Sequence, residues 1–235
     1  MIKAALNGGR TKDEHAAIPV TVEELAREAT AAAAAGAGAI HLHARDAFGA
    51  ETIDPVVVNG VAAVVREACG LPVGVSSAPW IETDQEKRFG LIRGWSSPDF
   101  GSAMFNDPGA PDLMRLFLEI GLGCEAAVLT VDDVEAFAAS GLADQALRVI
   151  VEPMTEDVDV ARREISDMHA ALDAHGIKIP RLVHGMGAAC WPLAEDALRS
   201  GFDIRIGFED VLVDPDGQPV SSNGDLVAAA AVWSV

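Results

Sequence analysis

Two histidines, His41 and His43, stand on alternate positions of the apolar stretch IHLHARD and are the clearest candidates for chemistry. On an extended strand, residues i and i+2 point to the same side, so we expect both imidazoles to enter one space. By the same rule, the stretch RIGFED aligns Arg205 with Glu209. Two imidazoles and a carboxylate with open coordination positions are typical of a catalytic zinc site, or of a site for another divalent first-row metal.

Asp210 follows Glu209 directly and is predicted to lie close to Arg205. A carboxylate whose pKa is set by a neighbouring arginine and a metal can act as a general base. Spacing alone leaves two other interpretations open. The histidines could be hydrogen-bonded core residues without a metal, and the arginine and the carboxylates could form a structural ion pair.

These stretches belong to a repeating pattern of an apolar run, a polar loop and a helical segment. The apolar runs predict strands over residues 2–8, 39–45, 71–77, 100–106, 124–130, 147–153, 181–186 and 203–209. Helices are predicted between them, most clearly over residues 21–36, 111–121, 131–141, 157–176, 191–201 and 223–233. The first of these helices opens with the capping box formed by Thr21 and Glu24.

Eight such units predict a (β/α)8 TIM barrel, a single domain over residues 1–235. A doubly wound open sheet is the alternative, but no GxGxxG follows the first strand. Active sites of barrels lie at the C-terminal ends of the strands. The further polar or glycine residues at these ends, which we expect to bind substrate, are Asn7, Arg10, Ser76, Ser77, Asn106, Glu152, His184, Gly185 and Gly187.

The stretch HGMG, which holds three of these residues, precedes a predicted helix. Its small residues could leave backbone N–H groups open to an anion at the helix N-terminus. A turn that requires glycine explains the same residues equally well.

The composition narrows the class of protein. A net charge of −19 argues against binding to nucleic acid or to an anionic membrane surface. The three cysteines form no CxxC motif, as in reduced intracellular proteins. No apolar run reaches membrane-spanning length and the first residues are too short for a signal peptide, so we expect a cytoplasmic protein.

The motifs NGGRT, AIHLHARD, VGVSSA, VEPM, HGMGAACWP and RIGFEDVL follow one another along the whole chain. In this order they resemble the β-keto acid cleavage enzymes, a family that includes 3-keto-5-aminohexanoate cleavage enzyme. The resemblance implies a TIM barrel that binds zinc through His41, His43 and Glu209. It also implies acetyl-CoA as co-substrate, so that a β-keto acid and acetyl-CoA give acetoacetate and a new acyl-CoA.

The resemblance implies roles for single residues as well. Asp210, supported by Arg205, takes a proton to form the enolate that attacks the thioester, and Ser76 holds an oxygen near that base. Asn106 falls where the family has a polar residue. Arg10 stands where the aminohexanoate enzyme has a glutamate suited to an ammonium group, so a cation there favours an anionic or a neutral keto acid.

Two other functions stay open. The first is a metal-dependent aldolase, hydrolase or isomerase on the same barrel that acts on a small anionic substrate without CoA. The second is a barrel that binds a small anion as a sensor or scaffold. Metal ligands together with a general base favour an enzyme. We also expect a homo-oligomer, either a dimer or a tetramer.

Overall fold

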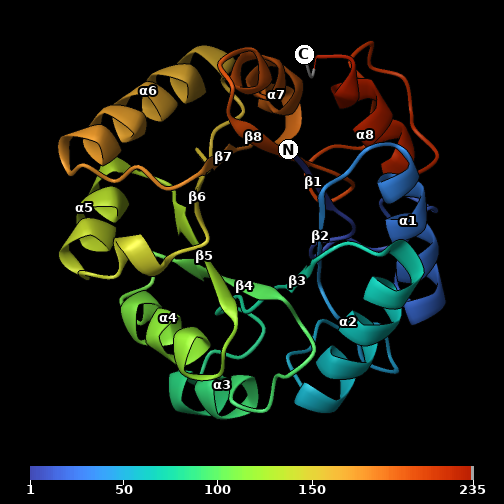
Figure 1. Cartoon of the computed structure of the whole chain (residues 1–235). Helices are drawn as coiled ribbons and strands as arrows, with labels where there is room; N and C mark the ends of the chain where they lie inside the picture. The colour runs from blue at the N-terminus through green and yellow to red at the C-terminus, as the bar shows by residue number, and fades with distance from the viewer. Residues whose placement is uncertain (234–235) are drawn as a thin grey trace.

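Eight short parallel strands close into a barrel, and helices surround it (Figure 1). This computed structural model describes residues 1–233. The strands are β1 (Ile2–Ala5), β2 (Ala39–Leu42), β3 (Val73–Val75), β4 (Phe100–Met104), β5 (Gly123–Val128), β6 (Arg148–Val151), β7 (Arg181–Val183) and β8 (Asp203–Ile206). Each strand pairs with the next in parallel and β8 pairs with β1, which confirms the predicted TIM barrel.

A helix follows every strand. These helices are α1 (Val22–Ala34), α2 (Pro55–Cys69), α3 (Gln85–Ile92), α4 (Ala110–Glu119), α5 (Val131–Ala139), α6 (Val158–Ala174), α7 (Cys190–Arg199) and α8 (Asn223–Ala231). The capping box of α1 forms as predicted, with Thr21 and Glu24 satisfying backbone N–H groups at the helix start. The helices α2 and α3 are additions to those placed from the sequence.

The strands are shorter than the apolar runs that predict them, most clearly at their C-terminal ends. β2 ends at Leu42 and β8 at Ile206, although the runs continue to residues 45 and 209. Beyond these points the backbone leaves the sheet, and some of its polar groups bind side chains instead. The Asn7 amide, for example, binds both backbone groups of His43. The ends of the strands are therefore loops that present side chains.

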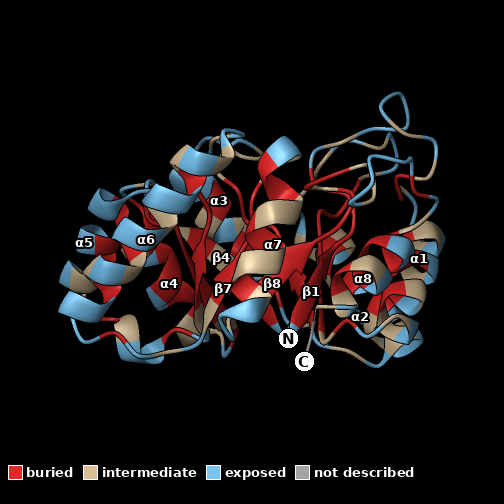
Figure 2. Ribbon diagram, turned by 90° about the horizontal axis from the view of Figure 1, so that it is seen from above, coloured by how far each residue is buried: buried red, intermediate tan, exposed pale blue. Residues whose placement is uncertain are grey.

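Buried residues fill the barrel wall and the inner faces of the helices, while the outer faces and the loops are exposed (Figure 2). The N-terminus lies at one edge of the barrel, and the longer loops rise from the opposite edge (Figure 2). Within residues 1–233, no helix is both long and apolar enough to cross a membrane. The three cysteines are free, as predicted.

Candidate active site

A cavity opens at the C-terminal ends of the strands, where the sequence places the candidate residues. Its volume is about 260 Å³, which suits a short-chain organic acid better than a polymer. The predicted site residues in its wall are His41, His43, Ser76, Ser77, Glu152, His184, Arg205 and Glu209.

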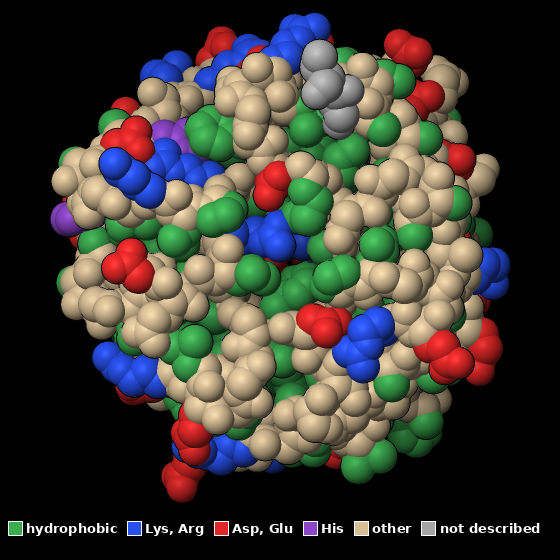
Figure 3. All heavy atoms as spheres, in the orientation of Figure 1, with side chains coloured by type: hydrophobic (Ala, Val, Ile, Leu, Met, Phe, Trp, Pro, Cys, Tyr) green, Lys and Arg blue, Asp and Glu red, His purple; other side chains and the backbone are tan. Residues whose placement is uncertain are grey.

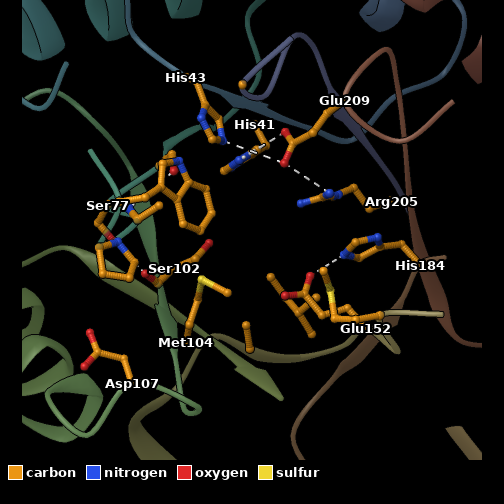
Figure 4. Close-up of a pocket in the computed structure, with 18 of the residues that line it drawn as sticks. His41, His43, Ser77, Ser102, Met104, Asp107, Glu152, His184, Arg205 and Glu209 are labelled. Atoms are coloured by element: carbon orange, nitrogen blue, oxygen red, sulfur yellow. Dashed lines mark hydrogen bonds and ion pairs between the residues drawn. The ribbon is translucent and has the colours of Figure 1, made fainter. Parts of the chain in front are cut away.

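The two histidines and Glu209 face one another at one side of this cavity (Figure 4). Nε2 of His41 lies 3.5 Å from Oε2 of Glu209, and Nε2 of His43 lies 3.7 Å from Oε1. One ligand atom from each residue lies within 4.8 Å of the other two. The convergence predicted from the two sequence stretches is therefore present.

The space between these atoms suits a metal ion. Ligand atoms bound at ~2.1 Å at the corners of a tetrahedron lie ~3.4 Å apart, close to the separations of 3.5 and 3.7 Å. Within residues 1–233, Oε2 of Glu209 and Nδ1 of His41 are buried without a hydrogen-bond partner. A buried polar atom without a partner is destabilising. His41, His43 and Glu209 therefore fit a divalent cation.

The pKa values of these groups shift in different directions. Burial lowers the pKa of His41 well below its ordinary value. Burial also disfavours charge on His43, but the carboxylates of Glu209 and Glu51 outweigh it and raise this pKa. Burial opposes ionisation of Glu209 too, yet Arg205 and the two histidines hold its pKa well below the usual range. The site therefore offers an ionised carboxylate and a neutral His41.

Two further side chains hold His43 in place. Its Nδ1 pairs with the carboxylate of Glu51, the kind of outer partner that fixes the orientation of a metal-binding histidine. The Asn7 amide donates to the His43 carbonyl oxygen and accepts from the His43 N–H, both at 2.9 Å. Asn7 is buried outside the cavity wall, so the structure gives it a positioning role in place of the predicted substrate contact.

Glu209 comes from a turn after β8, and not from the strand itself. The Asp210 N–H donates to the Gly207 carbonyl oxygen at 2.9 Å and closes this turn. Glycine is required because a Cβ at position 207 would lie 2.0 Å from the Ala5 carbonyl oxygen. The prediction that Arg205 and Glu209 share one strand face is therefore wrong about the local backbone, although the side chains do meet.

Arg205 pairs with both carboxylates of this turn. Its Nε lies 3.1 and 3.3 Å from the two oxygens of Asp210, and its Nη2 lies 3.1 Å from Oε1 of Glu209. Burial raises the pKa of Asp210, as suits a general base. Asp210 lines a neighbouring cavity and not the main one, so Arg205, which contacts it, connects Asp210 to the main cavity.

His184 extends this network along the cavity wall (Figure 4). Its Nε2 pairs with the carboxylate of Glu152, and its Nδ1 lies 3.8 Å from Oδ1 of Asp210. Burial opposes ionisation of Glu152, but the neighbouring His184 lowers its pKa. The cavity thus holds a second buried carboxylate and imidazole beside His41, His43 and Glu209.

Two predicted serines line the cavity after β3. The Ser77 hydroxyl donates to the Ser102 carbonyl oxygen at 2.6 Å. The Ser76 hydroxyl oxygen accepts the Ala78 N–H at 3.4 Å, which leaves its hydrogen free for a ligand. Of these two serines, Ser76 is therefore the better donor to a substrate oxygen.

Arg10 and Asn106, both predicted to bind substrate, lie outside the main cavity. Arg10 lines the neighbouring cavity, donates to the Glu209 carbonyl oxygen at 3.1 Å and pairs with Glu14. Asn106 is exposed in the loop after β4. The chain turns there, and the next residue, Asp107, enters the cavity wall instead.

The two glycines of the HGMG stretch are needed for the backbone conformation and for close packing. The Gly187 N–H donates to the Asp210 carbonyl oxygen at 3.2 Å, so the expectation that it is open to an anion is wrong. Gly187 has φ +52°, and a Cβ there would lie 2.4 Å from Oε2 of Glu156. A Cβ at Gly185 would meet the Leu193 side chain at 2.7 Å. Both residues fit the alternative of a turn that requires glycine.

Sequence reasoning missed Glu51, Arg88 and Asp107. The signal for Glu51 is the turn before it, where Asp46 accepts backbone N–H groups and the chain folds back toward His43. Arg88 lies on a helix that the periodicity does not reveal, and Asp107 stands next to the residue chosen in its place. Both line the main cavity.

The sequence pattern of one protein family, beta-keto acid cleavage enzyme, matches residues 1–233. The chain belongs to this family. It is therefore an enzyme that cleaves β-keto acids, as the motifs predict. It is 29% identical over 249 residues to the 3-keto-5-aminohexanoate cleavage enzyme of Fusobacterium nucleatum subsp. nucleatum, covering 97% of this chain and 88% of that enzyme. The enzyme of the same name from Acetoanaerobium sticklandii is 27% identical over 255 residues, with the same coverage.

Solved structures share the barrel at lower sequence identity. The binary complex of ObcA with oxaloacetate superposes with a TM-score of 0.69 at 17% identity, covering 90% of this chain but only 62% of that one. The 3-dehydroquinate dehydratase from Geobacillus kaustophilus HTA426 gives a TM-score of 0.59 at 14% identity, covering 98% of this chain and 90% of that one. At these identities the likeness concerns the fold alone.

Proposed function

We propose that this enzyme uses a divalent metal, with zinc as the first candidate, to react a β-keto acid with acetyl-CoA. The products are acetoacetate and a new acyl-CoA. The observation that carries the proposal is the placing of His41, His43 and Glu209 beside Arg205 in one cavity wall. Arg205 in turn holds the buried Asp210. A site for a Lewis acid thus adjoins a carboxylate with a raised pKa.

His41, His43 and Glu209 would hold the metal, which as a Lewis acid polarises the keto and carboxylate oxygens of the substrate. Ser76 is placed in the same wall to donate to a substrate oxygen. Arg205 balances the charge of the bound carboxylate. The substrate is thereby held with its C2 hydrogens toward Arg205 and Asp210.

Asp210 is the final acceptor of a C2 proton in this proposal. Arg205 stays protonated, because its carboxylate neighbours outweigh burial and raise its pKa, and it orients the Asp210 carboxylate that accepts this proton. The resulting enolate carbon bonds to the acetyl carbonyl carbon and expels the CoA thiolate. That thiolate attacks the C3 carbonyl, the C2–C3 bond breaks, and C2 regains its proton from Asp210. The products are acetoacetate and the acyl-CoA of the remaining side chain.

The direct test is a screen of β-keto acids with acetyl-CoA that measures acetoacetate, with and without a chelator. We expect acetoacetate from at least one keto acid, loss of activity with the chelator and recovery with added zinc. Full activity of metal-free protein contradicts the metal-dependent route. Turnover that continues without acetyl-CoA supports an aldolase, hydrolase or isomerase instead.

A variant pair ties the metal to its ligands. Purified enzyme should carry about one divalent metal per chain, and His41→Ala should carry none. His175→Ala is the matched control, because His175 lies at the end of α6 and pairs with Glu135 at the surface. It should keep both metal and activity. Gel filtration with light scattering tests the expected dimer or tetramer.

A further inference from the structure

Arg88 is a buried arginine that the reaction proposed above does not use. It lies on the inward face of α3, four residues before Ile92, and only 2% of it is exposed. A buried guanidinium is unfavourable unless its N–H groups find acceptors. Its Nη2 donates to Oδ2 of Asp107 at 2.6 Å, whereas its Nε is buried without a partner among residues 1–233. The guanidinium therefore has donors to spare.

Arg88 and Asp107 both line the main cavity. Figure 4 shows Asp107 on the opposite side of this cavity from Glu209 and Arg205, with Met104 between them. The wall around Met104 also includes the apolar side chain of Leu113. A substrate whose reacting end lies at the metal ligands therefore extends along apolar side chains toward the Arg88–Asp107 pair.

The pair is held in a fixed position. Oδ1 of Asp107 accepts the Gly109 N–H at 2.9 Å, while Oδ2 receives Arg88. Burial opposes ionisation of Asp107, but Arg88 and the Gly109 N–H outweigh it and lower its pKa. Gly109 in turn packs closely on Gln85 of α3, since a Cβ at position 109 would lie 2.9 Å from Oε1 of Gln85. Donors held in this way lose little conformational entropy when they bind a ligand.

We propose that the Arg88–Asp107 pair binds the far end of the substrate side chain and selects β-keto acids that carry a neutral hydrogen-bonding group there, such as a hydroxyl or a carboxamide. This inference rests on the proposed function. The unused N–H groups of Arg88 call for an acceptor. A second carboxylate would be repelled by the negative charge of Asp107, and an ammonium group would be repelled by the positive charge of Arg88. A hydroxyl or carboxamide can accept from Arg88 and donate to Asp107 without either conflict.

The test compares β-keto acids of equal length that end in a methyl, hydroxyl, carboxamide, carboxylate or ammonium group, each with acetyl-CoA. We expect kcat/KM to be about tenfold to a hundredfold higher for the hydroxyl or carboxamide substrate than for the methyl one. The two charged substrates should fall below the neutral polar ones. In Arg88→Met this preference should disappear, so that kcat/KM for the hydroxyl or carboxamide substrate is no longer higher than kcat/KM for the methyl one.

Arg93→Met is the matched control, because Arg93 ends the same helix but is exposed and pairs with Glu119. It should keep the preference. A highest kcat/KM for the methyl or a charged substrate, or a preference that survives in Arg88→Met, overturns this inference and leaves the proposed function intact. Failure of every β-keto acid to react overturns both. If Arg88→Met does not fold, the ranking in the unaltered enzyme decides by itself.

Discussion

Two groups of buried charges occupy the inside of the barrel, one at each end, and they differ in how closely their side chains approach one another. At the N-terminal end, Nζ of Lys3 lies 2.6 Å from Oε2 of Glu125, and both side chains are fully buried. At the C-terminal end, the two oxygens of Glu209 lie 3.5 and 3.7 Å from Nε2 of His41 and of His43. The side chains of His41, His43 and Glu209 line the main cavity, whereas those of Lys3 and Glu125 do not.

The N-terminal group continues to the surface. Arg148 places its Nε 3.2 Å from the second oxygen of Glu125 and its Nη1 3.5 Å from Asp203, which also binds the N-terminal amine. Basic and acidic side chains gather at the centre of the face in Figure 3. The comparison shows what separates two similar groups of charges. Where opposite charges meet at hydrogen-bonding distance the group supports the fold, and where the ligand atoms stand farther apart in a cavity wall the group can bind a ligand.

Removing the proposed base, Asp210, at the C-terminal end is expected to have the largest effect. In Asp210→Asn, turnover should fall by about 10²–10⁴-fold, because the proton taken from C2 loses its acceptor. Bound metal, measured by elemental analysis, should stay near one per chain. The matched variant is Glu152→Gln, which alters the other buried carboxylate of the cavity. A larger loss of turnover in Glu152→Gln than in Asp210→Asn would assign the base to Glu152.

At the N-terminal end, we expect a substitution to lower the stability of the fold. Lys3→Met leaves Glu125 buried with fewer partners, which should lower the free energy of unfolding by about 3–5 kcal/mol. Urea denaturation measures this change. Lys3→Met combined with Glu125→Gln should recover part of the loss, since no unpaired charge then remains. Metal content should be unchanged in both variants, and loss of the metal would show that the two ends are coupled.

The sequence was sufficient to predict the barrel because its units are regular. Every strand and six helices follow from periodicity and capping signals such as Thr21 with Glu24. The helices α2 and α3 are less evident, because α2 begins with a run of valines after Pro55 and α3 has only eight residues. Strand ends are also misplaced, since apolar residues such as Phe208 continue into a turn that only tertiary contacts create.

The candidate site was predictable where side-chain type and spacing define the chemistry, as for His41, His43 and Glu209. It was not predictable where a polar side chain binds the backbone. The Asn7 amide binds the backbone of His43, and the Gly187 N–H donates to the Asp210 carbonyl oxygen in the loop after β8. These choices depend on loops that meet across the barrel, and one sequence does not reveal them.

A smaller effect is expected at Glu51, because it contacts His43, a proposed metal ligand, without being a proposed metal ligand itself. Glu51→Gln keeps the shape but removes the charge that faces Nδ1 of His43. Loss of such an outer partner weakens metal binding by about 10–100-fold. Competition with a chromophoric chelator measures the dissociation constant. Glu86→Gln, at an exposed position of α3, should bind metal as the unaltered enzyme does; equal affinity in Glu51→Gln would remove Glu51 from the metal site.

The smallest effect is the pH dependence of metal binding. Because Glu209 and Glu51 outweigh burial and raise the pKa of His43, protons compete with the metal already above the ordinary histidine value of about 6.5. Affinity should therefore fall about tenfold per pH unit below that raised pKa. In metal-free protein, the stability of the fold depends on pH in the opposite direction to metal affinity. Protonated His43 stabilises the fold below its unfolded pKa, and this contribution is lost as the pH rises through the folded pKa.

The gain in Tm on adding zinc should accordingly be larger at pH 8 than at pH 6. In Glu51→Gln the pKa of His43 rises less, so the fall in affinity should begin at a lower pH than in the unaltered enzyme. This displacement distinguishes His43 from any other titrating group, because Glu51 pairs with His43. An affinity that does not change between pH 8 and pH 6 would mean that His43 stays neutral, and that the carboxylates around it do not act as the geometry indicates.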